Sequence, residues 1–368
     1  MKIKAAVCYE YGKPLVIDEI DLADPREEEV LVKMVGSGIC ATDNHSKNDG
    51  FGGWDHLPMV FGHEGSGIVE KVGPGVTDFN VGDAVVLSYP NCGECEPCKN
   101  GKVWYCDHSL ELIHGGKMAG GYSPLSKNDT PINNYFGTST FATHAVSNIK
   151  NIAKIDPDVV ATSDVAIFGP LACGLMTGSG TVLNDLKPEP GRSMLVYGAG
   201  AVGLSAIMAA KICGCTPIIC VDIVEDRLDM AKEVGATHVI NSKEVKDITA
   251  EVNKICGGQA DYCVEASGVE SCVKSAYNSV KLDGNVAIVA VSEHVSFDNF
   301  FFSMFGKTTS CVNMGNANPT LFIPKLIDWY KRGMFPFDKF IKFYSFDEIN
   351  TAMDDLAKGK MIKAVLKF

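Results

Sequence analysis

The sequence predicts an α/β protein built from a doubly wound parallel sheet and a second, β-rich domain. In the first third of the chain, short apolar runs are separated by Gly, Pro and Asp, which is typical of strands. From about residue 175, apolar strands alternate with helical segments, which indicates a parallel sheet with helices on both faces. The chain also has 368 residues, more than one hydrophobic core usually serves.

Each expected element follows from a short stretch of sequence. Apolar runs bounded by turn residues predict strands at 5–10, 15–20, 29–39, 65–73 and 83–89. From 194 to 242 the order is strand, glycine turn, helix, strand, helix and strand, and further strands are expected at 260–268, 284–291 and 308–315. A helix at 318–333 and a strand at 360–368 follow. We therefore expect a β-rich domain over 1–174, a parallel-sheet domain over 175–309, and a return to the first domain over 310–368.

Composition limits the classes of partner. The formal net charge of −12 argues against a general affinity for nucleic acid or anionic membranes, because both attract basic surfaces. The N-terminal segment lacks the apolar core of a signal peptide, and no apolar run is long enough to span a bilayer. Fourteen cysteines without an export signal fit a reducing compartment. We therefore expect a cytoplasmic protein.

Four cysteines lie close together in the run CGECEPCKNGKVWYC, at Cys92, Cys95, Cys98 and Cys106. Four thiolates on one short loop can surround Zn²⁺ as a tetrahedron and form a closed, structural site. A disulfide loop is one alternative, although nothing in the sequence suggests the oxidising compartment that it needs. An iron–sulfur cluster is a second alternative. We expect a structural zinc lobe over 92–106, and any reactive metal would need a separate, open site.

A glycine-rich turn with the pattern G-x-G-x-x-G is formed by Gly198, Gly200 and Gly203, between an apolar strand and an Ala-rich helix. Glycines there permit a tight turn and let backbone N–H groups approach a pyrophosphate. Asp222 ends the next strand, where its carboxylate can accept hydrogen bonds from ribose hydroxyls and repel a 2′-phosphate. The sequence therefore predicts a Rossmann-type site that prefers NAD to NADP. A glycine turn with no ligand is the alternative.

Three further segments supply metal-binding residue types: GSGICATDNH, FGHEGSG and PLACGLMTG. Each is ambiguous alone, because a lone cysteine is usually a buried apolar group and a lone histidine is usually structural. Together with the cysteine lobe and the glycine turn, they resemble the zinc-dependent medium-chain alcohol dehydrogenase family over essentially the whole chain. The segments GSGIVEKVGPGV, GDAVV, FGTSTFATHAV, AKEVGAT and GKMIKAVLKF are also similar to family segments. The C-terminal stretch from FIPKLIDWYKRG onward resembles bacterial aryl-alcohol (benzyl-alcohol-type) dehydrogenases.

The resemblance implies a fold and a set of metal ligands. The β-rich domain is expected to be GroES-like, and the parallel-sheet domain to be a Rossmann domain. Cys40, His63 and Cys173 are implied to bind a catalytic zinc whose fourth position is open. Glu64 is implied as an alternative ligand, and Asp43 would orient His63.

The resemblance also assigns a proton relay and cofactor contacts. Thr42 would take the proton of the alcohol, and His45 would pass it to solvent. The residues implied to hold NAD are Gly198, Gly200, Gly203, Asp222 and Arg227. Lys363 occupies a position where the family often has an arginine that contacts the pyrophosphate, and Ala41 replaces a basic residue that some members place beside Thr42. Both departures should weaken dinucleotide binding.

Together these parts imply an NAD-dependent zinc alcohol dehydrogenase with two zinc ions per chain, one catalytic and one structural. The expected reaction is the reversible oxidation of a primary alcohol, aryl or allylic, to the aldehyde, with hydride transfer to NAD. One alternative is a zinc-dependent dehydrogenase of a cyclic or other secondary alcohol. Another is an NADPH-dependent aldehyde reductase, which Asp222 disfavours. A third is a non-catalytic protein that binds zinc and dinucleotide.

Two groups of aromatic residues have open roles at this stage. Phe51 and Trp54 are candidates to line the substrate pocket, and a core or interface position is equally consistent with the sequence. The family forms homo-oligomers, either tetramers or dimers. The segment that is expected to form the interface contains Phe300, Phe301, Phe302 and Phe305.

Overall fold

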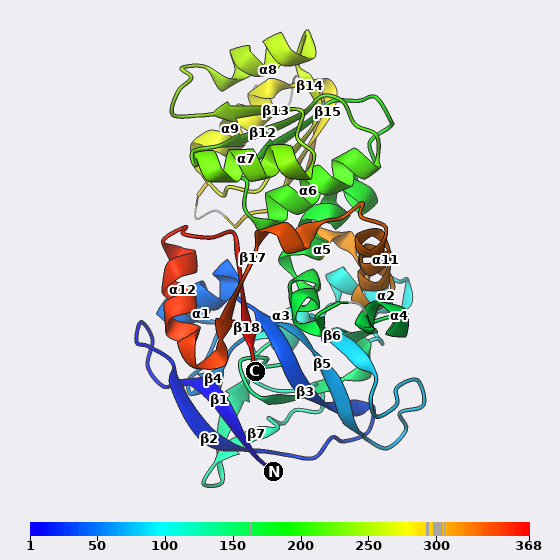
Figure 1. Cartoon of the computed structure of the whole chain (residues 1–368), viewed down its shortest axis with the longest axis vertical. Helices are drawn as coiled ribbons and strands as arrows, with labels where there is room; N and C mark the ends of the chain where they lie inside the picture. Colours follow the sequence, from blue (N-terminus) through cyan, green and yellow to red (C-terminus); the bar gives the residue numbers. More distant parts are fainter. Residues whose placement is uncertain (162, 292–293, 297–303, 305) are drawn as a thin grey trace. The chain divides into compact units, whose positions relative to one another are not determined.

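The chain divides into two compact units (Figure 1). A computed structural model describes residues 1–161, 163–291, 294–296, 304 and 306–368. Unit 1 comprises Met1–Cys173, Asn318–Lys331 and Asp338–Phe368, and unit 2 comprises Gly174–Ala317 and Arg332–Phe337. Both ends of the chain lie in unit 1. The four phenylalanines of the expected interface segment, at 300–302 and 305, lie outside the described residues.

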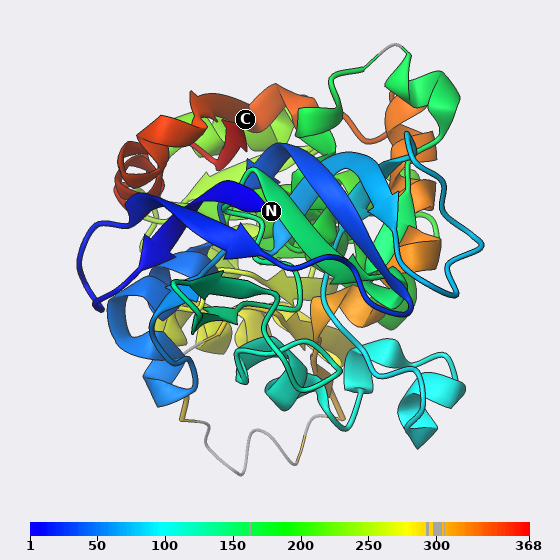
Figure 2. The ribbon, with the colours of Figure 1, turned by 90° about the horizontal axis from the view of Figure 1, so that it is seen from below.

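Unit 1 is rich in β-structure, as the sequence predicts. A closed barrel has the strand order β1 (Lys2–Cys8), β2 (Val16–Leu22), β7 (Leu125–Lys127), β8 (Thr130–Asn134) and β4 (Met59–Val60). Figure 2 shows the blue strands β1 and β2 beside the teal β7 and β8. These strands alternate buried and exposed residues only in part, and β1 ends in four consecutive buried residues, so both of its faces are covered there.

A seven-stranded sheet forms the rest of the unit 1 framework. Its order is β10 (Ile152–Lys154), β6 (Ala84–Leu87), β5 (Glu64–Val72), β3 (Glu29–Gly38), β18 (Lys363–Lys367) and β17 (Ile341–Ser345), and β9 (His144–Asn148) also pairs with β3. The last strand, β18, is antiparallel to β3, which accounts for the predicted return of the chain. Buried Val, Met and Leu side chains of β3, β5 and β6 make its core.

Short helices connect and cover these strands. They are α1 (Ala41–Gly53), α2 (Glu96–Lys99), η1 (Val103–Tyr105), α3 (Ser109–His114), η2 (Ile149–Asn151), α4 (Pro157–Val160), η3 (Val165–Ala172), α11 (Pro319–Lys331), η6 (Phe337–Phe340), η7 (Phe346–Glu348) and α12 (Ile349–Ala357). Helix η3 packs against β3 and β5. Two glycines permit this approach: a Cβ on Gly36 would lie 2.6 Å from Cα of Ala166, and one on Gly169 would lie 2.4 Å from the carbonyl oxygen of Glu64.

Unit 2 contains the doubly wound parallel sheet that the sequence predicts. Its order is β13 (His238–Asn241), β12 (Ile218–Asp222), β11 (Met194–Tyr197), β14 (Ala260–Glu265), β15 (Val280–Ile288) and β16 (Thr308–Cys311), and every pair is parallel. The first three strands run outward from the central strand β11 to one edge of the sheet. The chain then returns to the centre, and β14, β15 and β16 run outward to the other edge, which is the Rossmann arrangement. Strand β11 is buried throughout, as expected for a sheet covered on both faces.

Helices cover the sheet of unit 2. They are α5 (Gly174–Gly180), η4 (Thr181–Leu186), α6 (Ala201–Ile212), α7 (Glu225–Val234), α8 (Ile248–Cys256), α9 (Glu270–Ser279) and η5 (Met314–Asn316). Helix α6 packs beside α7, and α8 packs beside α9 (Figure 1). Within the described ranges, no single helix is long and apolar enough to cross a membrane. The consecutive helices η3 and α5–η4 reach the length of a membrane span only when they are taken together, and they are bent at the break between them. Most of their residues are buried.

Candidate metal centres and nucleotide-binding turn

Residues from distant parts of unit 1 meet in one buried group. The ligand atoms of Cys40, His63, Glu64 and Cys173 all lie within 4.8 Å of one another. Cys40 precedes α1, His63 and Glu64 lie where β4 leads into β5, and Cys173 follows η3. The family resemblance assigns all four residues to one metal site, and the structure brings them together.

Asp43 organises this group. Its Oδ2 accepts a hydrogen bond from the backbone N–H of Cys40 at 2.8 Å, which fixes Cys40 at the start of α1. Its Oδ1 lies 3.0 Å from Nδ1 of His63 and accepts from the N–H of Gly62 at 3.3 Å. The carboxylate is fully buried, and these polar contacts compensate its removal from water. Asp43 therefore links the cysteine and the histidine of the site.

The imidazole of His63 has one nitrogen to spare. Because Nδ1 faces Asp43, Nε2 points away from it, and Nε2 is buried without a hydrogen-bond partner among the described residues. The ring stacks on Phe136 with centroids 4.4 Å apart and meets the edge of Tyr135 at 5.9 Å. A buried imidazole nitrogen without a partner is costly, and a metal ion is the usual partner of such an atom. Two sulfurs and one imidazole nitrogen match the donor set of an open zinc site.

The pKa values of the two thiols of the site are shifted in opposite directions. A hydrogen bond from the thiol of Cys173 lowers the pKa of Cys40 well below its ordinary value, against the effect of burial. The same hydrogen bond, together with burial, raises the pKa of Cys173. A cation bound by both sulfurs would therefore displace a proton, because the thiolate is the form that binds metals.

Glu64 and Lys363 form a buried ion pair beside the thiols. Their Oε2 and Nζ atoms lie 2.5 Å apart, and Nζ also donates to the carbonyl oxygen of Ile39 at 3.0 Å. Burial raises the pKa of Glu64 to about 7, and the charge of Lys363 opposes that rise. The sequence does not reveal this pairing. The expected contact of Lys363 with a pyrophosphate stays a prediction.

The expected proton relay lies on α1. Oγ1 of Thr42 lies 3.5 Å from Sγ of Cys40, so the hydroxyl is next to the metal-binding group. His45 is exposed, and it stands three residues later on the same face of the helix. A proton leaving the buried group through Thr42 would therefore meet a titratable, solvent-facing side chain one turn away.

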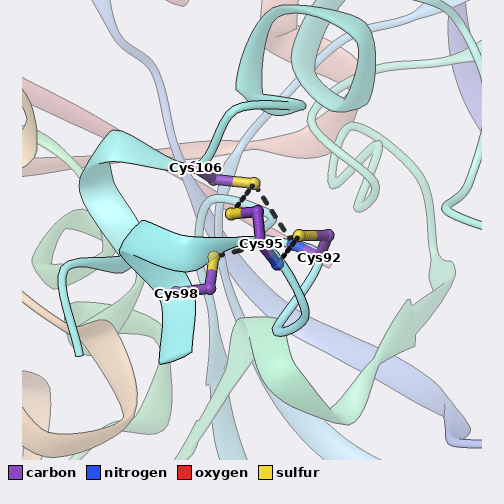
Figure 3. A group of neighbouring side chains, drawn as sticks. All are labelled: Cys92, Cys95, Cys98 and Cys106. Carbon is purple, nitrogen blue, oxygen red and sulfur yellow. Dashed lines mark hydrogen bonds between the residues drawn. The ribbon is translucent and has the colours of Figure 1, made fainter. Parts of the chain in front are cut away.

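The second cysteine group forms a separate lobe (Figure 3). Sγ of Cys92 lies 4.0 Å from Sγ of Cys98, and Sγ of Cys95 lies 4.0 Å from Sγ of Cys106. These separations are close to the edge of roughly 3.8 Å expected for a tetrahedron with Zn–S bonds of about 2.3 Å. Backbone N–H groups of Glu94 and Cys95 donate to Sγ of Cys92 at 3.4 and 3.3 Å. The four cysteines are free thiols, which argues against the disulfide alternative.

The glycine turn of unit 2 joins β11 to α6. Gly198 has a positive φ of 88°, which favours glycine. A Cβ on Gly203 would lie 1.8 Å from the carbonyl oxygen of Gly198, so only glycine lets the helix pack this closely. A Cβ on Gly200 would meet no atom within 4 Å, so the backbone there borders open space. This geometry fits a pyrophosphate at the N-terminus of α6.

Asp222 and Arg227 lie on the next strand and helix. Asp222 accepts hydrogen bonds from the N–H groups of Ala199, Ile223 and Val224 at 2.6, 2.7 and 2.9 Å. These three bonds fix the carboxylate beside the glycine turn and leave it capacity to accept more. Nε of Arg227 is buried without a hydrogen-bond partner in the described part of the chain. Both positions are compatible with the predicted contacts to a dinucleotide.

Comparisons with known proteins match the whole chain. Residues 26–156 match the family described as the alcohol dehydrogenase GroES-like domain, and residues 201–332 match the zinc-binding dehydrogenase family. Geraniol dehydrogenase of Castellaniella defragrans is 35% identical over 99% of this chain and 97% of its own length. Alcohol dehydrogenase class-P of Arabidopsis thaliana is 36% identical over 100% of this chain and 97% of its own.

Solved structures give the same result. Benzyl alcohol dehydrogenase from Acinetobacter calcoaceticus is 40% identical, with a TM-score of 0.94 over 100% of this chain and 99% of that chain. An alcohol dehydrogenase zinc-binding domain protein from Burkholderia ambifaria is 38% identical, with a TM-score of 0.95 over the same shares.

Removing the charge of Asp43 should weaken metal binding. Without the carboxylate, Asp43→Asn leaves His63 less basic and less well oriented, so zinc affinity at this site should fall by about 10- to 100-fold. The variant is dialysed against a series of chelator concentrations, and its zinc content is then measured. One of the two zinc equivalents should be lost at a lower chelator concentration than in the wild type. Asp49→Asn, which changes an exposed acid on the same helix, is the control. Wild-type retention of both equivalents in Asp43→Asn would contradict the assignment.

Cys98→Ser should act on stability through the other lobe. The variant should lose one zinc equivalent, and its melting temperature should fall by roughly 5–10 °C, because a structural metal contributes folding free energy. Calorimetry and metal analysis check both effects. Cys311→Ser, at an exposed cysteine outside both groups, should change neither value. If Cys98→Ser keeps its full zinc content, the four cysteines do not form one site.

Proposed function

Because the chain belongs to the zinc-dependent medium-chain alcohol dehydrogenase family, we propose that it oxidises a primary aryl or allylic alcohol reversibly to the aldehyde, with NAD as hydride acceptor. The observation that carries this proposal is the buried Nε2 of His63, which has no protein partner in the described structure and lies within 4.8 Å of two cysteine sulfurs. This donor set needs a cation, and three protein ligands would leave a position for an alcohol oxygen.

The proposal assigns two metal sites to each chain. Cys40, His63 and Cys173 would hold the catalytic zinc, with Glu64 as an alternative ligand that Lys363 holds by its charge. When bound, zinc would supply Lewis-acid chemistry and lower the pKa of the alcohol hydroxyl. The second zinc would be structural, and its ligands would be the four cysteines of the lobe, Cys92, Cys95, Cys98 and Cys106.

The chain's own residues would move the proton. Thr42, whose hydroxyl lies next to Cys40, would accept the alcohol proton. His45, exposed one turn further along α1, would release the proton to solvent. Loss of the proton prepares the carbinol carbon to give up a hydride.

The hydride acceptor would be held by unit 2. The glycine turn would receive the pyrophosphate, and Asp222 would accept hydrogen bonds from the adenosine ribose. Arg227 would provide a further contact. In this proposal, residues 1–174 and 310–368 form the catalytic domain, and 175–309 form the NAD-binding domain. As in the family, the enzyme would be a homo-oligomer, either tetramer or dimer.

Two observations support an aryl or allylic substrate. Among the similar proteins, one is named for geraniol, an allylic primary alcohol, and another for benzyl alcohol, an aryl primary alcohol. In this chain, the rings of Tyr135 and Phe136 pack directly on His63. A planar, apolar substrate bound at the metal would meet aromatic surface, which favours stacking.

A panel of alcohols tests the proposal. The zinc-loaded enzyme should oxidise benzyl and cinnamyl alcohol with NAD at a kcat/KM at least about tenfold above that for ethanol or cyclohexanol, because aromatic contacts add binding energy. Initial rates of NADH formation give the comparison. Faster oxidation of secondary alcohols would replace the substrate assignment, and no turnover of any alcohol would favour a non-catalytic protein.

The cofactor assignment has its own test. Replacing the carboxylate in Asp222→Ser removes the charge that repels a 2′-phosphate, so the ratio of kcat/KM for NADP to that for NAD should rise by roughly tenfold or more. Asp226→Ser, which removes one exposed charge from the same helix region, should leave the ratio unchanged. An unchanged ratio in Asp222→Ser would remove this residue from the ribose contact.

A further inference from the structure

A second buried carboxylate–histidine pair lies outside the candidate metal centre. Nδ1 of His114, the last residue of α3, lies 2.7 Å from Oδ1 of Asp55, which follows the end of α1. Their side chains are 7% and 0% exposed. Taking a carboxylate out of water is costly, so a pair buried this deeply and needed by no metal is a candidate for a functional role.

The pair is oriented from the Asp55 side. The backbone N–H of Asp55 donates to the carbonyl oxygen of Gly50 at 2.9 Å, and its carbonyl oxygen accepts from the hydroxyl of Tyr11 at 2.6 Å. The carboxylate then selects the tautomer of His114 that has its proton on Nδ1. Nε2 becomes an acceptor without a hydrogen bond to the residues that the structure describes, and it is not one of the fully buried polar atoms.

Aromatic rings pack around the imidazole of His114. Phe51 stacks on the His114 ring with centroids 5.1 Å apart and an angle of 20°. Trp54, Tyr135 and Phe136 lie at 6.5, 6.3 and 6.2 Å. Left-handed residues at the end of α1, including Phe51 with φ of 52°, turn the chain so that this ring faces His114. Apolar walls with one placed polar atom are the composition of a small-molecule subsite.

The same rings connect His114 to the candidate metal centre. Phe136 stacks on His63 at 4.4 Å and meets His114 at 6.2 Å, and Tyr135 contacts both histidines. One layer of aromatic rings therefore separates the free Nε2 of His114 from a proposed metal ligand. An aryl alcohol with its carbinol oxygen at the metal would extend along these rings toward His114.

We propose that His114 is a specificity-determining residue that accepts a hydrogen bond, through Nε2, from a phenolic hydroxyl on the ring of the substrate. Asp55 is the positioning residue that fixes the tautomer. The preferred substrates are then hydroxybenzyl or hydroxycinnamyl alcohols rather than unsubstituted ones. This inference rests on the proposed alcohol oxidation. An acceptor left without a partner by benzyl alcohol penalises that substrate, and the hydroxylated one gains a hydrogen bond.

The test compares 3- and 4-hydroxybenzyl alcohol with benzyl alcohol on the zinc-loaded, full-length enzyme. For wild type, kcat/KM should favour one hydroxylated alcohol by about tenfold or more. In His114→Phe this ratio should fall to near one, because phenylalanine offers no acceptor for the phenolic hydroxyl. His114→Gln, which keeps a polar atom at the place of Nε2, should retain part of the preference. His108→Phe, at an exposed histidine that begins the same helix, is the matched control and should keep the wild-type ratio.

The outcomes separate the inference from the proposed function. Equal kcat/KM for hydroxylated and plain benzyl alcohol in wild type overturns the inference, whether or not the variants fold. An undiminished preference in folded His114→Phe, verified by its melting curve, also overturns it. If wild type oxidises no aryl alcohol, the proposed substrate class fails. Calorimetric titration with the same alcohols then decides: tighter binding of a hydroxylated alcohol that His114→Phe abolishes supports the subsite, and equal binding overturns it.

Discussion

The hydrogen bond between Asp43 and His63 is the constraint on which the metal-binding group depends. One carboxylate caps the first turn of α1, holds Cys40 there, and turns the imidazole so that Nε2 faces the two sulfurs. Asp43 is fully buried, so losing the imidazole of His63 would leave its carboxylate with only the N–H groups of Cys40 and Gly62 as partners among the described residues. The same side chain therefore shapes the start of α1 and positions Cys40 and His63 as metal ligands.

Much of the fold was predictable because its signals are local. The apolar runs mark the strands, and the glycines near Gly198 with the strand and helix around them predict a Rossmann sheet, which the structure confirms. The cysteine lobe was predictable for the same reason, since all four sulfurs come from one short loop. Cys40, His63 and Cys173 could be grouped only through the resemblance to a family, because no local signal joins three segments so far apart.

Pairings across long distances in the sequence could not be predicted. For Lys363 the resemblance implied a contact with a pyrophosphate, and nothing in the sequence indicated that β18 pairs with β3 and that the buried ammonium lies against Glu64. His114 and Asp55 are likewise ordinary in the sequence, and only the barrel and the connecting loops bring them together inside aromatic rings. Such pairings follow from which segments become neighbours in the fold, and periodicity carries no information about that choice.

The place of β18 in the sheet has a consequence for biosynthesis. Its neighbour β3 is made early, but residues 39–362 leave the ribosome before Lys363 does. At about 5–20 residues per second, the end of β3 next to Cys40 waits many seconds with an unpaired edge and a reactive thiol exposed. Nascent chains in that interval are open to edge pairing with other strands and to thiol oxidation. Chaperone binding and a reducing environment during translation would therefore protect the yield of active protein.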